Sequence, residues 1–418
     1  MNAPRVSRGR DLAEGGRRIG IGPQWLARVV SGGFGKVLDR IDAGLVSGEI
    51  NLTLPDGSRR TLGGRAAGFA AEVKLHDYRS LLRLATGGSV GWYQAWEQGE
   101  WSSPDPVPLF ALFMYNAATL GNVGRARGPW RWLAKRVHRL HRNTREGAAR
   151  NIHAHYDLGN DFYAAWLGEV MAYSSAMFGT PDVLQTLEQA QRAKISAIAN
   201  HAKIGAGDTV LEVGCGWGAQ AEALADHGAA VTGISLSDEQ LAYCRLHDKA
   251  ARIDYRKQDY RDVTGQFDAV VSVEMVEAVG QEYWPDFFDC LARCLKPGGR
   301  AVIQYISIRD DLFDAYAASA DFIQAYIFPG GMLVRESEFK RLAAQRGLEW
   351  TDQVNFGLDY AETLRLWRAN FDAAAVQGRL PDGFDTRFCN LWRFYLMYCE
   401  GGFCGGGIDV VQVTLIKN

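Results

Sequence analysis

Several features that would assign a protein to a location or a chemistry are missing from this sequence of 418 residues. It contains no run of about 18 apolar residues, which argues against a membrane-spanning helix. Its first 20 residues are polar and rich in arginine, unlike the apolar centre of a secretory signal. Its formal net charge is only −2, which argues against a surface built for nucleic acid. We therefore expect a cytoplasmic protein.

Cysteine is sparse and poorly spaced for a metal or disulfide site. The seven cysteines form an odd set, and no two of them are spaced as C-x-x-C. Cys290 and Cys294 are four positions apart on a predicted helix. We predict buried thiols in a reducing compartment and no bound metal.

The length indicates more than one hydrophobic core, since a domain usually has about 100–200 residues. An apolar content of 47% is that of a globular protein. We expect four segments along the chain. They are a basic flexible arm over 1–20, a small α+β domain over 21–125, a basic amphipathic linker helix over 126–150, and a larger domain over 151–418 with an insertion at about 309–335.

The N-terminal domain shows short strand and helix patterns. Residues 48–54 alternate like a strand, and residues 55–58 have the composition of a turn. Strand-like sequence recurs near 67–74, and residues 75–85 have a helical pattern. Two roles remain open for this domain: a structural cap, or a surface that helps to dock a large substrate.

A basic segment follows this domain. Residues 125–150 carry nine lysines and arginines and a single acid, Glu146. Trp130 and Trp132 lie among these basic residues, a combination that suits the surface of an anionic phospholipid bilayer. The segment therefore predicts a peripheral protein at the inner face of the membrane. The alternative is a solvated linker helix whose tryptophans pack on a neighbouring domain.

Five predicted strands alternate with helices after residue 205. They cover 209–213, 230–234, 253–255, 267–273 and 300–308. This rhythm indicates an α/β fold with a doubly wound, Rossmann-like sheet, in which ligands bind beyond the carboxyl ends of the strands. The helical insertion over 310–328 either forms a lid or extends the core, and residues 409–417 alternate like a final strand.

A glycine turn follows the first of these strands. Gly214, Gly216 and Gly218 are spaced G-x-G-x-G, which differs from the G-x-G-x-x-G of a pyrophosphate-binding turn. Glycine lets a ligand approach the backbone closely. The acidic strand end before the turn suits a ligand with an amino-acid moiety, such as S-adenosylmethionine (SAM). Taken alone, the turn fits plain strand–helix packing equally well.

The chain resembles the cyclopropane-fatty-acyl-phospholipid synthase family of SAM-dependent methyltransferases. The resemblance extends from about residue 151 to the end and is weaker in the N-terminal part, which looks like the family's accessory domain. An ordered set of motifs is far more specific than one glycine turn. The motifs lie within 151–163, 173–174, 211–218 (with Gly-Cys-Gly-Trp-Gly), 233–240, 258–262 and 326–330.

The resemblance implies a class I methyltransferase sheet with SAM as its cofactor. Ser235 and Gln240 would supply neutral hydrogen bonds where many nucleotide sites use an acid, and Tyr260 would stack on the adenine. The implied cofactor-binding residues are Tyr173, Ser174, Glu212, Gly214, Cys215, Gly216, Gly218, Ser235, Gln240, Asp259 and Tyr260.

The resemblance also implies a reaction. The electrophilic methyl group of SAM would add to a cis double bond in an unsaturated acyl chain of a membrane phospholipid and leave a carbocation. Aromatic faces and a carboxylate stabilise such a cation in a dry pocket. Proton loss from the new methyl group closes a cyclopropane, the product that we expect first. Alternatives are a methyl-branched or furan-precursor fatty acid, or a SAM-binding lipid-interaction protein that has lost catalysis.

In the family, the proton acceptor is thought to be a bound bicarbonate. Ser175 stands here where the family has cysteine, and Gln304 where it has histidine. Ala278 replaces a usual histidine, and Glu274 stands where glycine is common. These departures leave open whether bicarbonate binds. The residues implied to hold it are Glu277, Tyr326, Ser175, Gln304 and Ile306.

Three catalytic candidates also have plain structural interpretations. Glu277 fits an acid at a helix N-terminus, Tyr326 fits a core aromatic with a partnered hydroxyl, and His155 fits a residue that satisfies backbone groups. Nucleic acid is not an expected partner, because no Asn-Pro-Pro-aromatic motif for exocyclic amines follows a strand. The sequence leaves the oligomeric state open, a homodimer included.

Overall fold

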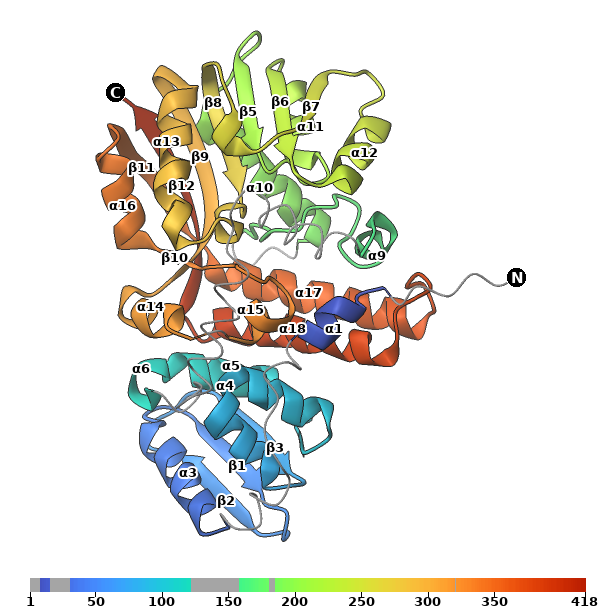
Figure 1. Ribbon diagram of the computed structural model, residues 1–418, viewed down its shortest axis with the longest axis vertical. Coiled ribbons are helices and arrows are strands. Elements are labelled where there is room, and N and C mark those ends of the chain that lie inside the picture. The colour runs from blue at the N-terminus through green and yellow to red at the C-terminus, as the bar shows by residue number, and fades with distance from the viewer. Residues whose placement is uncertain (1–7, 16–30, 122–157, 180–184, 320) are drawn as a thin grey trace. The chain divides into compact units, whose positions relative to one another are not determined.

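The computed structural model describes residues 8–15, 31–121, 158–179, 185–319 and 321–418 (Figure 1). The predicted basic helix over 126–150 and the candidate His155 lie outside these residues. The chain divides into two compact units. Unit 1 comprises 1–141, 311–329 and 383–408, and unit 2 comprises 142–310, 330–382 and 409–418.

Unit 1 contains a four-stranded sheet in the order β2-β1-β3-β4. The strands are β1 (Glu49–Thr53), β2 (Arg59–Gly63), β3 (Ala70–Leu75) and β4 (Trp101–Ser102). β1 and β2 form an antiparallel hairpin around residues 54–58, as the turn composition predicts. The prediction of a helix from residue 75 was wrong at its start, because β3 includes Leu75 and α4 covers Arg79–Glu97.

The remaining helices of unit 1 come from both halves of the sequence. They are α1 (Arg10–Gly15), α3 (Ser31–Gly44), α5 (Val107–Tyr115), α6 (Ala117–Leu120), α15 (Phe322–Tyr326) and α18 (Thr386–Cys404). α14 (Asp310–Ala317) begins at the boundary between the units. α18 packs closely on α5: a Cβ atom on Gly401 would lie 2.5 Å from Cβ of Phe110. Only a residue without a side chain permits this approach.

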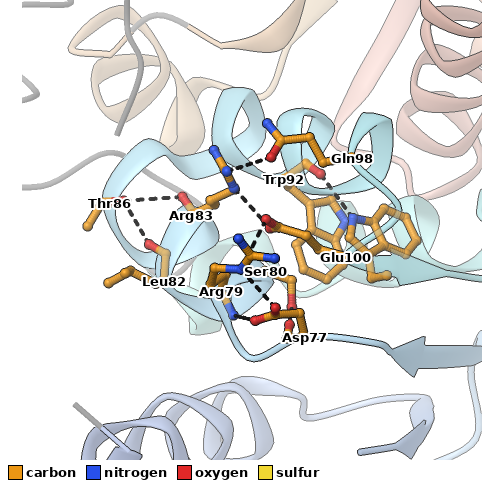
Figure 2. Close-up of polar contacts among 10 residues, drawn as sticks. Asp77, Arg79, Ser80, Leu82, Arg83, Thr86, Trp92, Gln98 and Glu100 are labelled. Atoms are coloured by element: carbon orange, nitrogen blue, oxygen red, sulfur yellow. Dashed lines mark hydrogen bonds and ion pairs between the residues drawn. The ribbon is translucent and has the colours of Figure 1, made fainter. Parts of the chain in front are cut away.

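A buried ion pair fixes the turn between α4 and β4 (Figure 2). Glu100 is only 3% exposed, and its carboxylate accepts a hydrogen bond from Nε of Arg83 at 2.9 Å. Arg79 pairs with Asp77 at 2.8 Å and lies 3.7 Å from Glu100. Trp101, which follows Glu100, stacks on Trp92 of α4 with ring centroids 4.3 Å apart. These contacts hold the helix against the sheet of unit 1.

Unit 2 is built on an eight-stranded sheet with the path β11-β12-β9-β8-β5-β6-β7, to which β10 adds beside β9. β5 to β9 are parallel to one another, whereas β11 and β12 pair antiparallel. From β5 the next strands along the chain, β6 and β7, are added on one side, and β8 and β9 are then added on the other side of β5. This reversal of the strand order is typical of a doubly wound fold. The strands are β5 (Thr209–Val213), β6 (Ala230–Ser235), β7 (Ile253–Lys257), β8 (Phe267–Val273), β9 (Leu295–Ile308), β10 (Val334–Arg335), β11 (Leu348–Asn355) and β12 (Ile408–Lys417).

Helices cover this sheet. Right-handed crossovers place α11 and α12 on one face and α13 on the other, and α10 packs on α11 while α16 packs on α13. A buried apolar cluster that includes Ile198, Val210, Leu224 and Val271 fills the space between the first face and its helices. The helices are α9 (Asn160–Ala164), α10 (Leu187–Ala202), α11 (Ala219–Asp226), α12 (Asp238–His247), α13 (Trp284–Cys294), α16 (Glu336–Ala344) and α17 (Gly357–Val376), with short 3-10 turns at 260–262, 276–278 and 281–283.

One strand boundary differs from the prediction. We expected a strand from residue 300, but β9 begins at Leu295 and includes the glycine-rich segment 296–299. Its pairing with β8 shifts register between Phe267 and Ala269, so the glycine-rich segment is accommodated as an irregularity within the ladder. In the part of the chain that the structure describes, no helix has the length and hydropathy to cross a membrane.

Candidate functional site

A cavity opens in unit 2 beyond the carboxyl ends of β5, β6 and β8. It lies where the chain reverses direction in the sheet, which is the usual ligand position in this fold. Its lining includes every residue that the sequence assigned to the cofactor except Gly218. The lining residues are Met171–Ser174, Lys194, Ile195, Glu212–Trp217, Ala219, Gln220, Ile234–Leu236, Gln240, Gln258–Tyr260, Val273–Met275 and Ala278.

The glycine turn shapes one wall of the cavity. Gly214 and Gly216 have φ values of 84° and 53°, a left-handed conformation that favours glycine. A Cβ atom on Gly214 would lie 2.8 Å from the side chain of Met275, whereas a Cβ atom on Gly216 would meet nothing within 4 Å. Gly216 therefore presents bare backbone to open space. Gly218 lies at the N-terminus of α11, and its role is to begin that helix.

Buried charges of both signs meet at the floor of the cavity. Glu212, on β5, and Lys194, on α10, are each 3% exposed. Nζ of Lys194 donates to Oγ of Ser174 at 2.7 Å. Burial raises the pKa of Glu212 to about 8 and lowers that of Lys194 to about 8, although each charge partly offsets the other's shift. Oε2 of Glu212 is buried without a hydrogen-bond partner among the described residues, so it remains available to a ligand.

A neutral polar pair follows β6. Oγ of Ser235 donates to Oε1 of Gln240 at 3.1 Å, and the backbone N–H of Ser237 donates to the same Ser235 oxygen. Ser237 also caps α12 by accepting from the backbone N–H of Gln240. The helix start thus fixes both predicted side chains at the cavity wall.

The acid after β7 is already paired. Asp259 receives hydrogen bonds from Nε and Nη2 of Arg261 at 2.8 and 2.6 Å, so its charge is neutralised inside the protein. The neighbouring Tyr260 is buried, and burial raises the pKa of its hydroxyl above the ordinary value. That hydroxyl has no hydrogen-bond partner among the described residues. Tyr260 therefore offers the cavity an aromatic surface and an unused donor.

Aromatic side chains hold the segment that carries Tyr173 and Ser174. The ring of Tyr173 lies 5.5 Å from those of Tyr163 and Trp367, the latter on α17. Trp217, from the glycine turn, donates its indole N–H to Oδ1 of Asn160 at 2.7 Å. Residues far apart in the sequence therefore hold Tyr173 and Trp217 at the cavity wall.

Glu277 lies just outside the cavity lining. Its Oε1 accepts the backbone N–H of Ile306 on β9. The resemblance implied that both residues hold a bicarbonate, and that role stays a prediction. Its Oε2 is buried with no hydrogen-bond partner in the described residues. Burial, with a smaller contribution from the carboxylate of Glu274, raises the pKa of Glu277 to about 8. The group is therefore mostly neutral at pH 7.

Ser175 and Gln304 meet at a third carboxylate, that of Glu274. The backbone N–H of Ser175 and Nε2 of Gln304 both donate to Oε1 of Glu274 at 2.9 Å. The Ser175 hydroxyl is directed elsewhere, to the carbonyl of Ala176 at 2.8 Å. Ser175 and Gln304 are fully buried, and Glu274 lines the cavity.

Tyr326 belongs to unit 1. Its hydroxyl accepts a hydrogen bond from Nε2 of Gln94 at 3.2 Å, and its ring packs on Tyr93 and Phe322 with centroids 4.8 and 5.5 Å apart. These contacts match the core-aromatic interpretation, and a catalytic role for Tyr326 stays a prediction. His155 lies outside the described residues.

Sequence reasoning missed Lys194. A lysine within the helical pattern of 186–202 is normally exposed, so nothing in the pattern indicated burial beside Glu212. The sequence marked Glu274 only by its position, at which the family commonly has glycine. Its φ of 48° explains that preference, because a left-handed backbone is easiest for glycine. Among the described residues, no cluster of histidine, cysteine or acidic side chains has the arrangement of a metal site.

Comparison with known proteins gives this site a context. The sequence profile of the family described as mycolic acid cyclopropane synthetase matches residues 143–413. The tuberculostearic acid methyltransferase of Mycobacterium tuberculosis is 37% identical over 383 residues, which cover 88% of each chain. The cyclopropane-fatty-acyl-phospholipid synthase of Escherichia coli K12 is 30% identical over 351 residues, which cover 83% of this chain and 88% of that one.

A solved structure has the same fold as unit 2 and belongs to the same family. The crystal structure of a mycolic acid cyclopropane synthase complexed with SAH and CTAB aligns with a TM-score of 0.59 and 28% identity. The alignment covers 64% of this chain and 98% of the other. The doubly wound sheet predicted from the sequence is thereby confirmed.

Proposed function

Because the chain belongs to the mycolic acid cyclopropane synthetase family of SAM-dependent methyltransferases, we propose that it methylates the cis double bond of unsaturated acyl chains in membrane phospholipids. The observation that carries this proposal is the cavity at the carboxyl edge of β5, β6 and β8, which gathers ten of the eleven residues expected to contact SAM. The named activities of two relatives, on a fatty acid and on a fatty-acyl phospholipid, support the substrate class.

The residues of the cavity fit SAM. The unpartnered Oε2 of Glu212 suits the positively charged amino group of the methionine moiety. Bare backbone at Gly216 leaves room for that moiety, and the buried ring of Tyr260 suits the adenine. When bound, SAM supplies an electrophilic methyl group.

The other residues of the site would manage the cation that forms on the acyl chain. The ring of Tyr173 lines the cavity and lies 5.5 Å from the rings of Tyr163 and Trp367, and these rings present electron-rich surfaces. The carboxyl groups of Glu274 and Glu277 add negative charge when ionised. Burial of these groups keeps water from adding to the cation.

The product follows from where the cation loses its proton. Loss from the new methyl group closes a cyclopropane, and loss from a neighbouring chain carbon leaves a methylated open chain. We favour the open-chain, methyl-branched product. It is supported by the higher identity to a fatty acid methyltransferase, 37% against 30% for the cyclopropane synthase. The changes at positions 175, 274 and 304 alter the surroundings of the step that separates the two products. A cyclopropane is the second candidate.

Residues 125–150 are proposed to bring the enzyme to the cytoplasmic surface of the membrane. Nine basic residues and two tryptophans in this segment suit anionic headgroups. A homodimer is one assembly compatible with this proposal, and size-exclusion chromatography with light scattering would determine it.

Lipid analysis tests the proposed function. The protein is expressed in a bacterium whose phospholipids are rich in monounsaturated acyl chains, and these chains are examined by mass spectrometry. We expect acyl chains enlarged by one CH₂ unit. NMR of the isolated product then distinguishes cyclopropyl protons from a branch methyl.

A purified-protein assay provides the matching control. The protein is mixed with SAM and vesicles of either unsaturated or fully saturated phospholipid, and release of SAH is measured. Release with unsaturated vesicles alone supports the proposal. SAM binding without SAH release from either kind of vesicle would instead identify a lipid-interaction protein that has lost catalysis.

A further inference from the structure

Several hydrogen-bond donors surround the carboxylate of Glu274. Its carboxylate accepts the backbone N–H of Ser175 and Nε2 of Gln304, each at 2.9 Å, and the side chain of Tyr360 also hydrogen-bonds to it. Its own backbone N–H donates to the carbonyl of Gln304 at 2.8 Å. Contacts from the segment before α10, from β9 and from α17 thus fix Glu274 in the loop after β8.

The donors that face Glu274 have fixed orientations. Oε1 of Gln304 accepts a hydrogen bond from Nε2 of Gln412 on β12 at 3.3 Å, so its amide N–H groups must point the other way, toward Glu274. The hydroxyl of Ser175 donates to the carbonyl of Ala176, so Ser175 offers only its backbone N–H. Both donors are satisfied by one protein carboxylate.

An exogenous bicarbonate does not fit beside these residues. The resemblance led us to expect that Ser175 and Gln304 would hold it, but their available donors are already used by Glu274. A second anion would also face the carboxylate of Glu274 at close range, and two like charges in a buried site repel each other strongly.

The backbone of Glu274 is strained. Its φ of 48° is a left-handed conformation, which is unfavourable for a residue with a side chain. Strain of this kind persists where surrounding contacts hold it and is concentrated at functional sites. The strain here directs a carboxylate into the cavity that lies next to Gly214 and Tyr173.

We propose that Glu274 is the proton acceptor of the reaction and takes the place of a bound bicarbonate. This inference rests on the proposed function. The methylated acyl carbocation loses a proton to a carboxylate oxygen of Glu274, so a C–H bond breaks and an O–H bond forms. The electron pair of the broken bond neutralises the cation as a new alkene or as the third side of a ring. The proton passes to solvent after the product leaves.

The charged groups around Glu274 favour this role. Burial raises the pKa of its carboxyl, which makes the ionised form a stronger base, while Ser175, Gln304, Lys194 and Tyr360 limit the rise. The carboxyl of Glu277 is also nearby, and burial keeps it mostly neutral at pH 7. The positive charge of Lys194 helps to keep Glu274 ionised before the reaction.

Two substitutions and one change of buffer test the proposal. Glu274→Gln preserves shape but removes the base. Glu274→Gly removes the carboxylate, relieves the left-handed strain and leaves the donors of Ser175 and Gln304 facing a hole. SAH release with unsaturated phospholipid vesicles is measured in CO₂-free buffer and in the same buffer with millimolar bicarbonate or formate. SAM binding and Tm are measured for each variant to verify folding.

We expect the wild-type rate to be the same with and without bicarbonate. Both variants should bind SAM normally and lose turnover by about 100-fold or more, the usual contribution of a general base. Formate or bicarbonate should restore part of the activity of Glu274→Gly but not that of Glu274→Gln, in which the hole is filled.

Two results would overturn the role of Glu274 while leaving the proposed function intact. One is a wild-type enzyme that slows when bicarbonate is removed, and the other is a Glu274→Gln variant that keeps its turnover. Both results can be observed only if the wild-type enzyme releases SAH, so they leave the proposed function intact. Absence of SAH release from the wild-type protein under every condition would overturn the proposed function together with this inference.

Discussion

At the scale of single residues, Glu277 has one carboxylate oxygen held by Ile306 and another with no hydrogen-bond partner in the described residues. We predict that Glu277→Gln keeps its SAM affinity but lowers turnover by about 100-fold, because a neutral amide cannot stabilise the carbocation. Burial raises the pKa of Glu277 to about 8. Wild-type turnover should therefore rise between pH 7 and pH 9 as the carboxylate ionises, and the variant should lose that rise.

Rate measurements across this pH range, with calorimetry for SAM binding, check the prediction. Glu349→Gln on β11 serves as the matched control, since it makes the same chemical change at an exposed side chain that does not line the cavity. Full turnover in Glu277→Gln would leave that residue with the structural role of holding β9.

Glu212 links stability to ligand binding. Burial raises its pKa from 4.5 to about 8, so the folded protein binds one more proton than the unfolded chain between these pH values. The contribution of Glu212 to the free energy of unfolding therefore falls as pH rises from 4.5 to 8, by at most about 1.4 kcal/mol per pH unit, and levels off above. Glu212→Gln has no group to ionise. We predict that this variant becomes more stable than the wild type as pH rises, yet binds SAM at least about tenfold more weakly.

Urea unfolding at pH 5.5 and pH 8.5, together with SAM titrations, measures both effects. Ligand-free protein is used for the unfolding experiments, because SAM binding would add its own stabilisation. A stability difference that is the same at both pH values would mean that Glu212 does not titrate in this range.

At the scale of secondary-structure elements, the turn between β5 and α11 can be tested against a turn of similar backbone geometry. Gly216 and Gly207 both have left-handed φ values, 53° and 89°, and a Cβ atom on either would meet nothing within 4 Å. Alanine at either position should cost about 1–2 kcal/mol of stability through backbone strain. Only Gly216 lines the cavity.

We therefore predict that Gly216→Ala weakens SAM binding by at least about tenfold, whereas Gly207→Ala leaves it unchanged. Thermal unfolding and SAM titration of both variants provide the comparison. Equal affinities would show that the turn contributes packing alone.

The same elements show what the sequence could and could not predict. β5 and β8 were placed to the residue, because a short apolar strand is a local pattern. The helices α17 and α18 were not predicted. α18 contains two glycines and buries aromatic side chains such as Trp392 and Phe394 on several sides, so its pattern lacks a single apolar face.

Within the site, the sequence identified residues but not their partners. Local motifs marked Ser175 and Gln304, yet their common contact with Glu274 depends on pairing between β8 and β9 and on a left-handed backbone. Gln412 orients Gln304 from a strand 108 positions further along the chain. Such contacts follow from tertiary structure and leave no local signal.

At the scale of the whole molecule, the basic segment over 125–150 remains the proposed link to the membrane. We predict that reversing the charges of Arg131, Arg136 and Arg139 weakens binding to anionic vesicles and makes the remaining binding less sensitive to salt. Each basic residue near an anionic surface contributes about 1 kcal/mol.

Vesicle sedimentation over a range of ionic strength measures this effect. Vesicles of neutral phospholipid are the control, since charge reversal should change little there. Unaltered binding to anionic vesicles would favour the solvated linker helix.

The division of the chain into units also determines when the protein can fold during its synthesis. Unit 1 is completed only by residues 383–408, and unit 2 only by β12, at Ile408–Lys417. Domains usually fold as they leave the ribosome, N-terminal part first. Neither unit has that opportunity here, because each waits for the last 36 residues of this sequence. A nascent chain stalled after residue 382 should therefore remain protease-sensitive throughout, and its exposed apolar surfaces would make it a substrate for chaperones.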